Sequence, residues 1–273
     1  MDNRLEEIIS SFQKVSGKIT LLTGAGISAE SGLPTFRGKD GYWKLGSKEY
    51  RPEEMATMRM FRQAPYEVWY WYLYRRSIYG NAEPNQGHTA IAELERIYQN
   101  SFTLITQNVD GLHLKGGNSP ERTFQIHGNI NFMRCLNNCS NKLIPIPKDI
   151  FYTDRDGQIS EEDKERLVCP DCGSITRPHI LWFDESYNEQ FYRFETSIKT
   201  ASETDLLIVV GTSGGTTLPI HIGSIVTNRG GYIIDINLEE NRFSDMAKAA
   251  SKGCALRGKS GDILPKIAEL LSK

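Results

Sequence analysis

The sequence lacks long hydrophobic runs, an excess of charge of either sign and any large number of cysteines. No apolar stretch approaches the roughly 20 residues that a membrane-spanning helix needs. Lysine and arginine total 32 against 34 aspartates and glutamates, which gives a net charge of −2 and no strong positive field to gather nucleic acid. We therefore expect neither a membrane nor a nucleic acid among the partners.

The N-terminus lacks the features of an export or targeting signal. It has no secretory apolar region, it carries acidic residues early, and it is not rich in arginine and serine. These absences predict a cytoplasmic location. Five cysteines in 273 residues do not suggest a disulfide scaffold, and a chain without an export signal favours thiolates that hold a metal.

Short apolar runs alternate with amphipathic segments along most of the chain. Strands are predicted at 18–23, 102–107, 122–128, 205–210 and 231–237, and helices at 2–16, 52–64, 65–80, 85–100, 188–203, 219–228, 243–252 and 261–272. This alternation predicts an α/β fold with an open, mostly parallel sheet covered by helices on both faces. The length suits one large domain with a modest insert.

The segment 130–178 differs in character, because it holds four of the five cysteines in two close pairs, Cys135 with Cys139 and Cys169 with Cys172. Four thiolates in a tetrahedral array suit Zn²⁺ and leave no open position for a catalytic water, so this spacing predicts a structural zinc site. The alternative is four unrelated cysteines. Cys254 stands alone and is most simply a small apolar core residue.

A glycine-rich loop, "GAGISA", follows the first predicted strand and opens a helix, which is the context of a dinucleotide-binding loop. Gly24 and Gly26 allow a pyrophosphate to approach the backbone, and Ala29 takes the place of a third small residue. A tight turn without a ligand is the alternative. No predicted strand ends in Asp or Glu about 20 residues further on, as the ordinary fingerprint requires, so another group must hold the ribose.

Polar side chains follow the next two predicted strands. Gln107, Asn108 and Asp110 come at the carboxyl end of one strand, and His127 lies at the end of the other. Open α/β sheets bind ligands at this edge, and imidazole is the usual general base near neutral pH. Each residue alone is more often structural, but together they converge on the crevice of the glycine loop.

The motifs "GAGISAESGLPTFRG", "TQNVDGLH", "QIHGNI", both cysteine pairs, "GTS" and "IN" occur in that order. With them the chain resembles the sirtuins, the NAD-dependent protein-lysine deacylases, over residues 17–270. The resemblance implies a Rossmann-like domain formed by 1–129 and 179–273, with a zinc-ribbon domain, 130–178, inserted in it. It also implies that NAD is consumed as a co-substrate and that the products are nicotinamide, acyl-ADP-ribose and free lysine.

The resemblance also assigns the site residues. The catalytic residues would be His127, Asn108 and Asp110. The residues that contact NAD would be Gly24, Ala25, Gly26, Ser28, Thr35, Phe36, Arg37, Trp43, Gln107, Asn108, Val109, Asp110, Gly211, Thr212, Ser213, Asn237, Leu238, Glu239 and Ala255. Asn237, Leu238 and Glu239 would hold the adenine ribose in place of the missing acid.

An extended substrate peptide carrying an acylated lysine would pair with the segment "HILWFDE", at Ile180, Leu181, Trp182 and Phe183. The chain departs from the family pattern at Asp184, where glycine is usual. It also departs after "GTS", where Gly214 and Gly215 replace the larger apolar residues of many members.

Tyr72 and Arg75 stand at i and i+3 on one helical face. They resemble the signature of sirtuins that remove succinyl and malonyl groups. An arginine suits such substrates, because its guanidinium can bind the carboxylate of the acyl group through two hydrogen bonds. Ala56 would leave room for the longer acyl chain, and Arg76, about 100° around the helix, suits a solvated face. The alternative is that Arg75 forms a surface ion pair and Tyr72 only packs.

Two other functions are compatible with parts of this pattern. An ADP-ribosyltransferase or NAD glycohydrolase would consume NAD without acyl-lysine, although simple glycosidic cleavage does not need His127. A zinc-ribbon binding module would turn over no NAD at all. The sequence thus predicts a deacylase that accepts acetyl-lysine and prefers succinyl- or malonyl-lysine, and that is a monomer.

Overall fold

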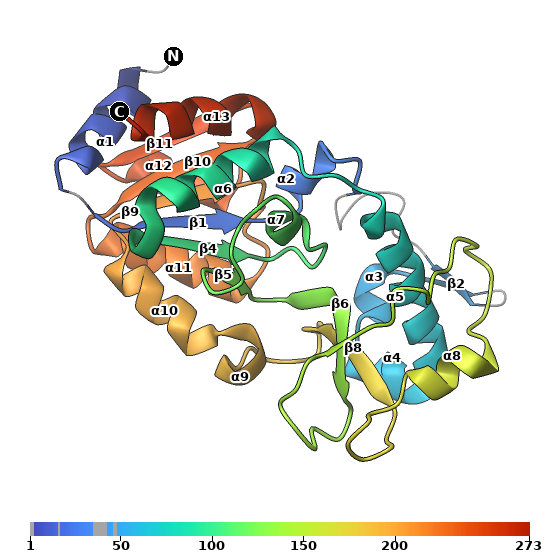
Figure 1. Ribbon diagram of the computed structural model, residues 1–273. Coiled ribbons are helices and arrows are strands. Elements are labelled where there is room, and N and C mark those ends of the chain that lie inside the picture. Colours follow the sequence, from blue (N-terminus) through green and yellow to red (C-terminus); the bar gives the residue numbers. More distant parts are fainter. Residues whose placement is uncertain (1–2, 16, 35–42, 46–47) are drawn as a thin grey trace.

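The computed structural model describes residues 3–15, 17–34, 43–45 and 48–273. Its larger body is a six-stranded sheet in the order β11-β10-β9-β1-β4-β5, in which every neighbouring pair is parallel (Figure 1). The strands are β1 (Ile19–Thr23), β4 (Phe102–Thr106), β5 (Thr123–Gln125), β9 (Leu206–Val210), β10 (Tyr232–Asn237) and β11 (Gly253–Arg257). This sheet confirms the predicted α/β fold.

Helices cover both faces of the sheet. One face carries α1 (Asn3–Gln13), α6 (Gln86–Tyr98) and α13 (Ser260–Leu271), and the other carries α10 (Phe194–Glu203), α11 (Thr217–Asn228) and α12 (Arg242–Ala249). Successive strand residues point to opposite faces, so Ile19 and Leu21 of β1 join the first core and Leu22 joins the second. A parallel sheet buried on both faces therefore has continuous apolar strands.

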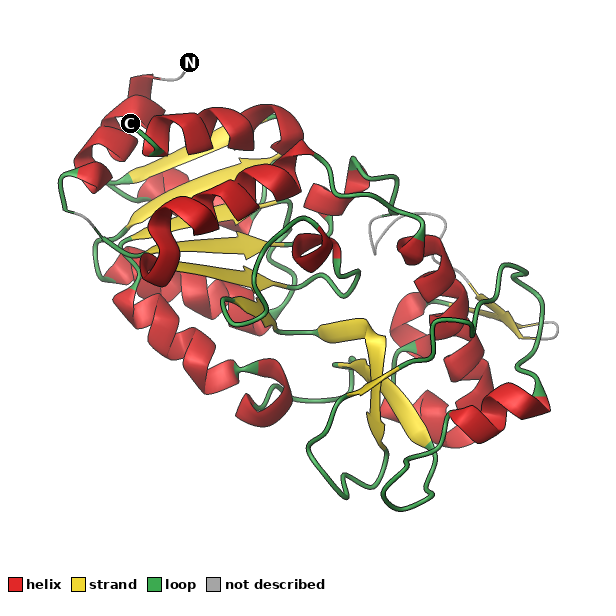
Figure 2. Cartoon of the chain, viewed as in Figure 1, coloured by secondary structure: helices red, strands yellow, loops and turns green. Residues whose placement is uncertain are grey.

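A second body contains a three-stranded sheet in the order β7-β6-β8 (Figure 2). Its strands are β6 (Gly128–Cys135), β7 (Ile144–Pro145) and β8 (Thr176–Ile180), and its helices are α3 (Pro52–Met55), α4 (Met58–Gln63), α5 (Pro65–Gly80) and α8 (Glu161–Arg166). The rings of α5, including Trp69 and Trp71, share one core with Met133 and Trp182. The inserted segment thus packs on helices that precede it in the chain; the division into domains stays a prediction.

Short elements complete the described chain. They are α2 (Gly26–Ala29), β2 (Trp43–Leu45), β3 (Lys48–Tyr50), the 3₁₀ helix Gln99–Ser101, α7 (Leu112–Lys115) and α9 (Glu189–Tyr192). Several of them join the two bodies or lie at the carboxyl edge of the large sheet.

The structure divides two of the predicted helices and adds one strand. The predicted helix 52–64 is two helices, because the chain turns at Ala56 and Thr57 begins α4 by accepting the Met60 N–H (3.0 Å). The predicted helix 188–203 is also two, α9 and α10, separated by Arg193 in a left-handed conformation. Strand β11 was not predicted. The sequence predicted only that Cys254 is a core residue, and this cysteine is buried.

The predicted strand 122–128 is shorter than expected. It ends at Gln125, and the next strand begins at Gly128, so His127 lies in the connection between β5 and β6. Gly128 has φ +90°, and a Cβ there would lie 2.0 Å from the His179 carbonyl oxygen. Only glycine fits at this crossing from one body to the other.

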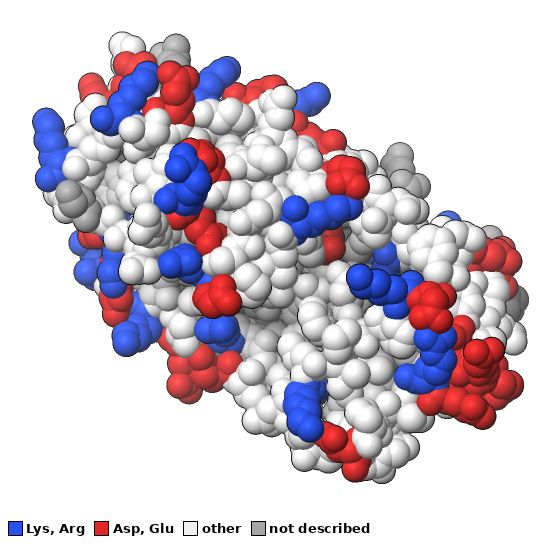
Figure 3. Space-filling model, in the orientation of Figure 1, with Lys and Arg blue, Asp and Glu red and all other residues white. Residues whose placement is uncertain are grey.

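Charges are interspersed over the face shown in Figure 3, with acidic groups gathered near α8. Among the described residues, no helix is both long and apolar enough to cross a bilayer.

Candidate active site

The carboxyl ends of the strands bring the predicted cofactor residues to one edge of the sheet. Gly24 follows β1, Gln107 follows β4, Gly211 follows β9, and Asn237 ends β10. The order in which strands are added to the sheet reverses at β1, because β4 and β5 lie on one side of it and β9 to β11 on the other. Such a switch point is where open α/β sheets bind ligands.

The glycine loop packs directly against the loop after β9. The N–H of Gly24 donates to the Val210 carbonyl (2.9 Å), and that of Gly26 donates to the Gly211 carbonyl (2.8 Å). A Cβ on Gly26 would lie 2.7 Å from the Gly211 Cα. Contact between the two loops is thus a reason for these glycines that the sequence did not suggest. The helix they open, α2, is only four residues long.

Asn108, Ser28 and Asp110 form a buried chain of hydrogen bonds beside this loop. Asn108 Nδ2 donates to the Gly24 carbonyl (3.1 Å) and to Ser28 Oγ (3.2 Å), and Ser28 Oγ donates to Asp110 Oδ2 (2.8 Å). Burial raises the pKa of the Asp110 carboxyl, while the Leu112 N–H and the Ser28 hydroxyl lower it. The structure brings these three predicted residues together.

Gln107 links four parts of the edge. Its Nε2 donates to Thr212 Oγ1 (2.8 Å), and its Oε1 accepts from Thr216 Oγ1 (3.1 Å). Its main-chain N–H donates to the Thr23 carbonyl (3.0 Å), and its own carbonyl oxygen lies 3.1 Å from His127 Nδ1. The Gln107 side chain therefore fixes the β9 loop and the start of α11, and its main-chain carbonyl holds the candidate base.

His127 is half-buried and held at both ring nitrogens. The Gln107 carbonyl lies at Nδ1, and the Tyr187 hydroxyl lies 2.8 Å from Nε2. Loss of solvation lowers the pKa of His127 to about 4, and the bond to the Gln107 carbonyl opposes that shift. The ring is therefore neutral at pH 7, as a general base must be.

Tyr187 was missed in the sequence. It follows the link between the two bodies, 60 residues beyond His127, and it belongs to none of the motifs above. Its ring stacks on Phe194 with centroids 6.2 Å apart. The available signal was a large aromatic residue two positions after the "WFDE" segment.

The remaining predicted cofactor residues are spread along the same edge. Asn237 Nδ2 donates to the Thr212 carbonyl (2.9 Å), which joins β10 to the β9 loop. The side chains of Ser213, Leu238 and Glu239 are exposed, and those of Ala25, Val109 and Ala255 are half-buried. Trp43 lies in β2, and Thr35, Phe36 and Arg37 lie outside the described residues.

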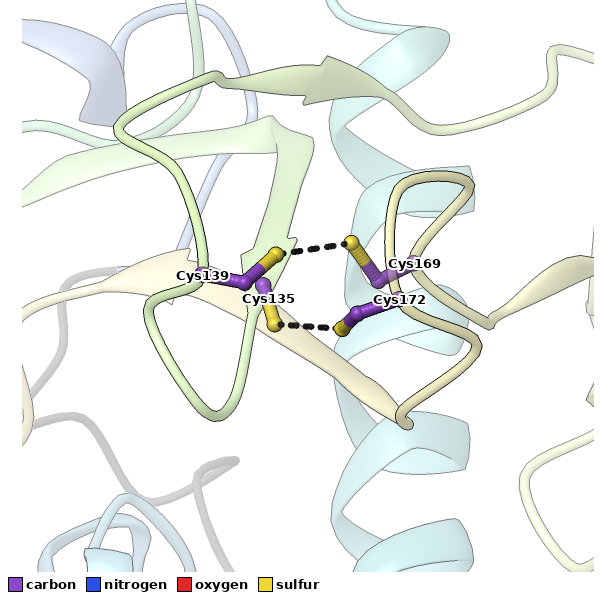
Figure 4. A group of neighbouring side chains, drawn as sticks. All are labelled: Cys135, Cys139, Cys169 and Cys172. Carbon is purple, nitrogen blue, oxygen red and sulfur yellow. Dashed lines mark hydrogen bonds between the residues drawn. The ribbon is translucent and has the colours of Figure 1, made fainter.

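The four cysteines of the second body converge on one point (Figure 4). Their sulfurs all lie within 4.8 Å of one another, with Cys135 to Cys172 and Cys139 to Cys169 at 3.5 Å. Zinc–thiolate bonds of about 2.3 Å in a tetrahedron place the sulfurs about 3.8 Å apart. The cysteines therefore fit a four-coordinate Zn²⁺, which Cys135 and Cys169 would hold from the buried side.

The segment after β8 crosses between the bodies next to His127. The Leu181 N–H donates to the His127 carbonyl (2.9 Å), and the Phe183 N–H donates to the Ala56 carbonyl (3.0 Å). Ile180, Trp182 and Ala56 are buried, whereas the Phe183 side chain is 55% exposed. A peptide that adds a strand here has to use the carbonyl groups of this segment or displace one of these bonds.

Tyr72 lies in the core of the second body, and Arg75 is half-buried. The Tyr72 hydroxyl accepts a hydrogen bond from Trp182 Nε1 (3.0 Å). Burial raises the pKa of Tyr72, and the Trp182 bond and the nearby charge of Arg75 partly offset this rise. The Arg75 guanidinium lies 5.1 Å from the Trp71 ring centre and 5.4 Å from that of Tyr79, whose hydroxyl it contacts.

The prediction that Arg76 lies on a solvated face of the helix is wrong. Its guanidinium is half-buried and donates to the carbonyls of Ile146 (3.3 Å), Pro147 (3.3 Å) and Ile150 (3.0 Å). The inserted segment folds over this side of α5 and supplies acceptors that helix geometry alone could not reveal. Of the two adjacent arginines, Arg76 hydrogen-bonds the inserted segment and Arg75 stacks on aromatic rings.

A sequence model described as the Sir2 family matches residues 24–217. The chain belongs to the Sir2 family. The resemblance to the sirtuins, predicted from the motifs, is thereby confirmed. The matched residues run from the glycine loop to the start of α11 and include His127 and all four clustered cysteines.

Curated Sir2-family relatives match this chain over nearly its whole length. An NAD-dependent protein deacylase of Leptospira interrogans serogroup Icterohaemorrhagiae serovar Lai (strain 56601) is 38% identical over 270 residues, which cover 96% of each chain. An NAD-dependent protein deacylase of Pyrococcus furiosus is 38% identical over 261 residues, again 96% of each.

Solved Sir2 structures share the fold. A crystal structure of a Sir2 homolog–NAD complex has a TM-score of 0.79 and 34% identity, and the match covers 99% of this chain and 94% of that one. A triple mutant of Sir2 homologues in complex with 2′-O-acetyl ADP-ribose has a TM-score of 0.78 and 35% identity, over 99% and 96% of the two chains.

Proposed function

We propose that this protein removes acyl groups from protein lysine side chains and consumes NAD in each turnover. The observation that carries the proposal is the position of His127, a neutral imidazole between the cofactor edge of the sheet and the segment that links the two bodies. Relatives at 38% identity are named NAD-dependent protein deacylases, which supports the same activity here.

The reaction needs a pocket that holds the two substrates together and excludes water. An amide oxygen of acyl-lysine is a weak nucleophile, so it attacks the anomeric carbon of NAD only as nicotinamide leaves and positive charge develops on the ribose. Water would otherwise take that carbon. We expect this pocket to be lined by Asn108 and Asp110, which are fixed through Ser28, and by Gln107, which is fixed through Thr212.

His127 acts after the first bond has formed. Its unprotonated nitrogen takes a proton from a ribose hydroxyl, and the hydroxyl oxygen attacks the carbon of the former amide. Addition of water then gives free lysine and acyl-ADP-ribose. General-base help of this kind is typically worth about 10²–10⁴-fold in rate. The Sir2 homologues bound to 2′-O-acetyl ADP-ribose support this class of product.

The cysteine cluster has a separate role. Four thiolates saturate a tetrahedral Zn²⁺, so the ion would cross-link the connections around β6 and β8 and take no part in the reaction. A monomeric state and a cytoplasmic location stay predictions.

Nicotinamide release with and without an acylated peptide tests the proposed function. We expect release to depend on the peptide, and His127→Ala to lower deacylation about 100-fold or more while the thermal unfolding midpoint stays close to that of the unaltered protein. Release without peptide would instead indicate an ADP-ribosyltransferase or NAD glycohydrolase. Normal deacylation by the alanine variant would remove His127 from the mechanism.

We further propose that succinyl- and malonyl-lysine are preferred over acetyl-lysine. The Tyr72 hydroxyl accepts from Trp182 and so retains its own proton to donate, while stacking on Trp71 and Tyr79 orients the Arg75 guanidinium. These groups suit a carboxylate at the end of the acyl chain, and the buried Ala56 belongs to the same core.

The ratio of kcat/KM for succinyl and acetyl peptides tests this preference. We expect Arg75→Met to lower the value for succinyl peptide about 30-fold or more and to leave the acetyl value within about threefold, since only the first substrate carries a carboxylate. Equal loss on both peptides would mean that the arginine is structural.

A further inference from the structure

The proton-accepting atom of His127 already has a partner. The ring nitrogen Nδ1 lies 3.1 Å from the Gln107 carbonyl oxygen, which can only accept a hydrogen bond. Nδ1 must therefore carry the proton of the neutral ring. Nε2 then holds a lone pair, and the group that lies 2.8 Å from it, the Tyr187 hydroxyl, is the donor.

Packing holds the Tyr187 ring in this position. It stacks on Phe194 at an interplanar angle of 22°, and it contacts the core beneath α10 and α11. Burial raises the pKa of Tyr187 to about 12, and Thr216 beside its hydroxyl opposes that shift, so the phenol keeps its proton. The phenol can therefore donate to a neutral Nε2 between the pKa of His127, about 4, and its own pKa, about 12.

The backbone on both sides of Tyr187 is also fixed. Upstream, Arg177 Nη2 donates to Glu185 Oε2 (2.8 Å), and the second oxygen of that carboxylate pairs with Nη1. Downstream, Asn188 begins α9 by accepting the Phe191 N–H (2.9 Å). The hydroxyl is therefore presented to His127 by a segment held at both ends.

The His127 ring has few polar neighbours besides Tyr187. Within the described part of the chain, no charged side chain forms an ion pair with His127 or shifts its pKa. Among the residues that the structure describes, the polar groups bonded to the ring are the Gln107 carbonyl and the Tyr187 hydroxyl, and only the hydroxyl of this pair can titrate.

We propose that Tyr187 is a positioning residue of the base: in the ligand-free protein its hydroxyl occupies Nε2 of His127, and it gives up that place to a ribose hydroxyl when the substrates bind. This proposal rests on the proposed function. A lone pair accepts one strong hydrogen bond, so both hydroxyls cannot use Nε2 together. Tyr187 thus fixes the ring plane in advance and keeps the base covered until the sugar arrives.

The proton transfer balances without Tyr187. The ribose O–H bond breaks, an N–H bond forms at Nε2, and the electron pair left on oxygen attacks the former amide carbon. The imidazolium later returns the proton as lysine leaves. The Tyr187 bond therefore stabilises the free enzyme but not the transition state. Because kcat/KM reports the free-energy difference between these two states, the bond lowers kcat/KM.

Tyr187→Phe tests the proposal, because it removes the hydroxyl and keeps the ring that stacks on Phe194. Tyr98→Phe is the matched control; it removes a hydroxyl that bonds the Leu271 carbonyl (3.3 Å), far from the site. Two readouts are needed. The first is the ¹⁵N NMR signals of the His127 ring in the ligand-free proteins as a function of pH, and the second is kcat/KM for NAD at saturating acyl peptide.

We expect the unaltered protein to carry the proton on Nδ1. In Tyr187→Phe the hydroxyl that donates to the unprotonated Nε2 is lost, and the neutral ring loses that stabilisation. We therefore expect the pKa of His127 to rise, with about two- to tenfold greater proton affinity. We also expect kcat/KM for NAD to rise about two- to tenfold. Tyr98→Phe should change neither.

Other results would overturn the proposal. They are a proton on Nε2 in the unaltered protein, a pKa of His127 that Tyr187→Phe leaves unchanged, and a kcat/KM that is unchanged or falls, as it would if the phenol relayed the proton. An unaltered protein that deacylates nothing would overturn the proposed function instead. The NMR experiment needs no substrate and would still decide whether Tyr187 holds the base.

Discussion

The pKa of His127 is set by where the ring lies. Free imidazole titrates near 6.5, but loss of solvation lowers this pKa to about 4, although the Gln107 carbonyl bond favours the protonated form. A base with a low pKa is fully available at neutral pH and accepts a proton less readily. The burial of the ring thus sets the strength of the base.

This shift predicts the acid limit of the activity. The neutral ring is the active form, so kcat/KM for deacylation should stay level as pH falls through 6.5 and decline only as pH approaches about 4. The measurement is a pH–rate profile with denaturation followed in parallel. An acid limb near pH 6.5 would contradict the assignment of a desolvated base.

Asp184, unlike His127, has a role that became visible only in the structure. Its two carboxylate oxygens accept the N–H groups of Met58 (2.8 Å) and Arg59 (3.1 Å), which begin α4. The sequence marked this position as a departure from the family pattern but gave no role for it. The partners are about 125 residues away in the chain, beyond the reach of any local pattern.

Removal of this carboxylate should destabilise the second body. We expect Asp184→Ala to lower the free energy of unfolding by about 0.5–2 kcal/mol, the usual cost of losing a helix cap. Asp184→Asn keeps one acceptor oxygen and should cost less than half as much. Chemical denaturation of the three proteins measures the difference; equal stability of the alanine variant would show that water replaces the carboxylate.

At the scale of elements, the short apolar strands were the most predictable feature. β1, β4, β9 and β10 fall within the predicted runs, because a strand buried on both faces is mostly apolar. β11 is half-buried at the sheet edge and ends in Arg257, so its composition is too mixed to indicate a strand. The break at Ala56 was also unpredictable, because helix propensity continues through it.

The zinc site would cross-link a short strand and exposed loops of the second body. β7 has two residues, and the loops that carry Cys139 and Cys172 are exposed. Loss of the ion would leave four thiolates close together with no shared cation. We therefore expect the second body to depend on zinc and the six-stranded sheet to be much less affected.

Removal of zinc by a chelator, or Cys169→Ser, tests this dependence. Amide hydrogen exchange around β6 to β8 should speed up by about tenfold or more, while β1, β4 and β9 keep their protection. Cys254→Ser, which alters a buried cysteine outside the cluster, serves as a control for loss of a thiol. Unchanged exchange after complete removal of zinc would contradict a structural role.

At the scale of the whole molecule, the sequence predicted which strand ends would meet but not how the two bodies join. Gln107, Asn108 and Asp110 could be placed because parallel strands all end at one edge. The contacts of Arg76 and Tyr187 could not, because each joins segments about 60 to 70 residues apart with no shared periodicity. The joint between the bodies is made of such contacts.

The central claim is that a lysine acyl group is transferred to the ribose of NAD at the joint between the two bodies. Mass spectrometry of the products from NAD and an acylated peptide tests it most directly. We predict one acyl-ADP-ribose and one nicotinamide for each lysine freed. Free carboxylic acid with unmodified ADP-ribose from the first turnover, or ADP-ribose attached to the peptide with its acyl group intact, would contradict the account.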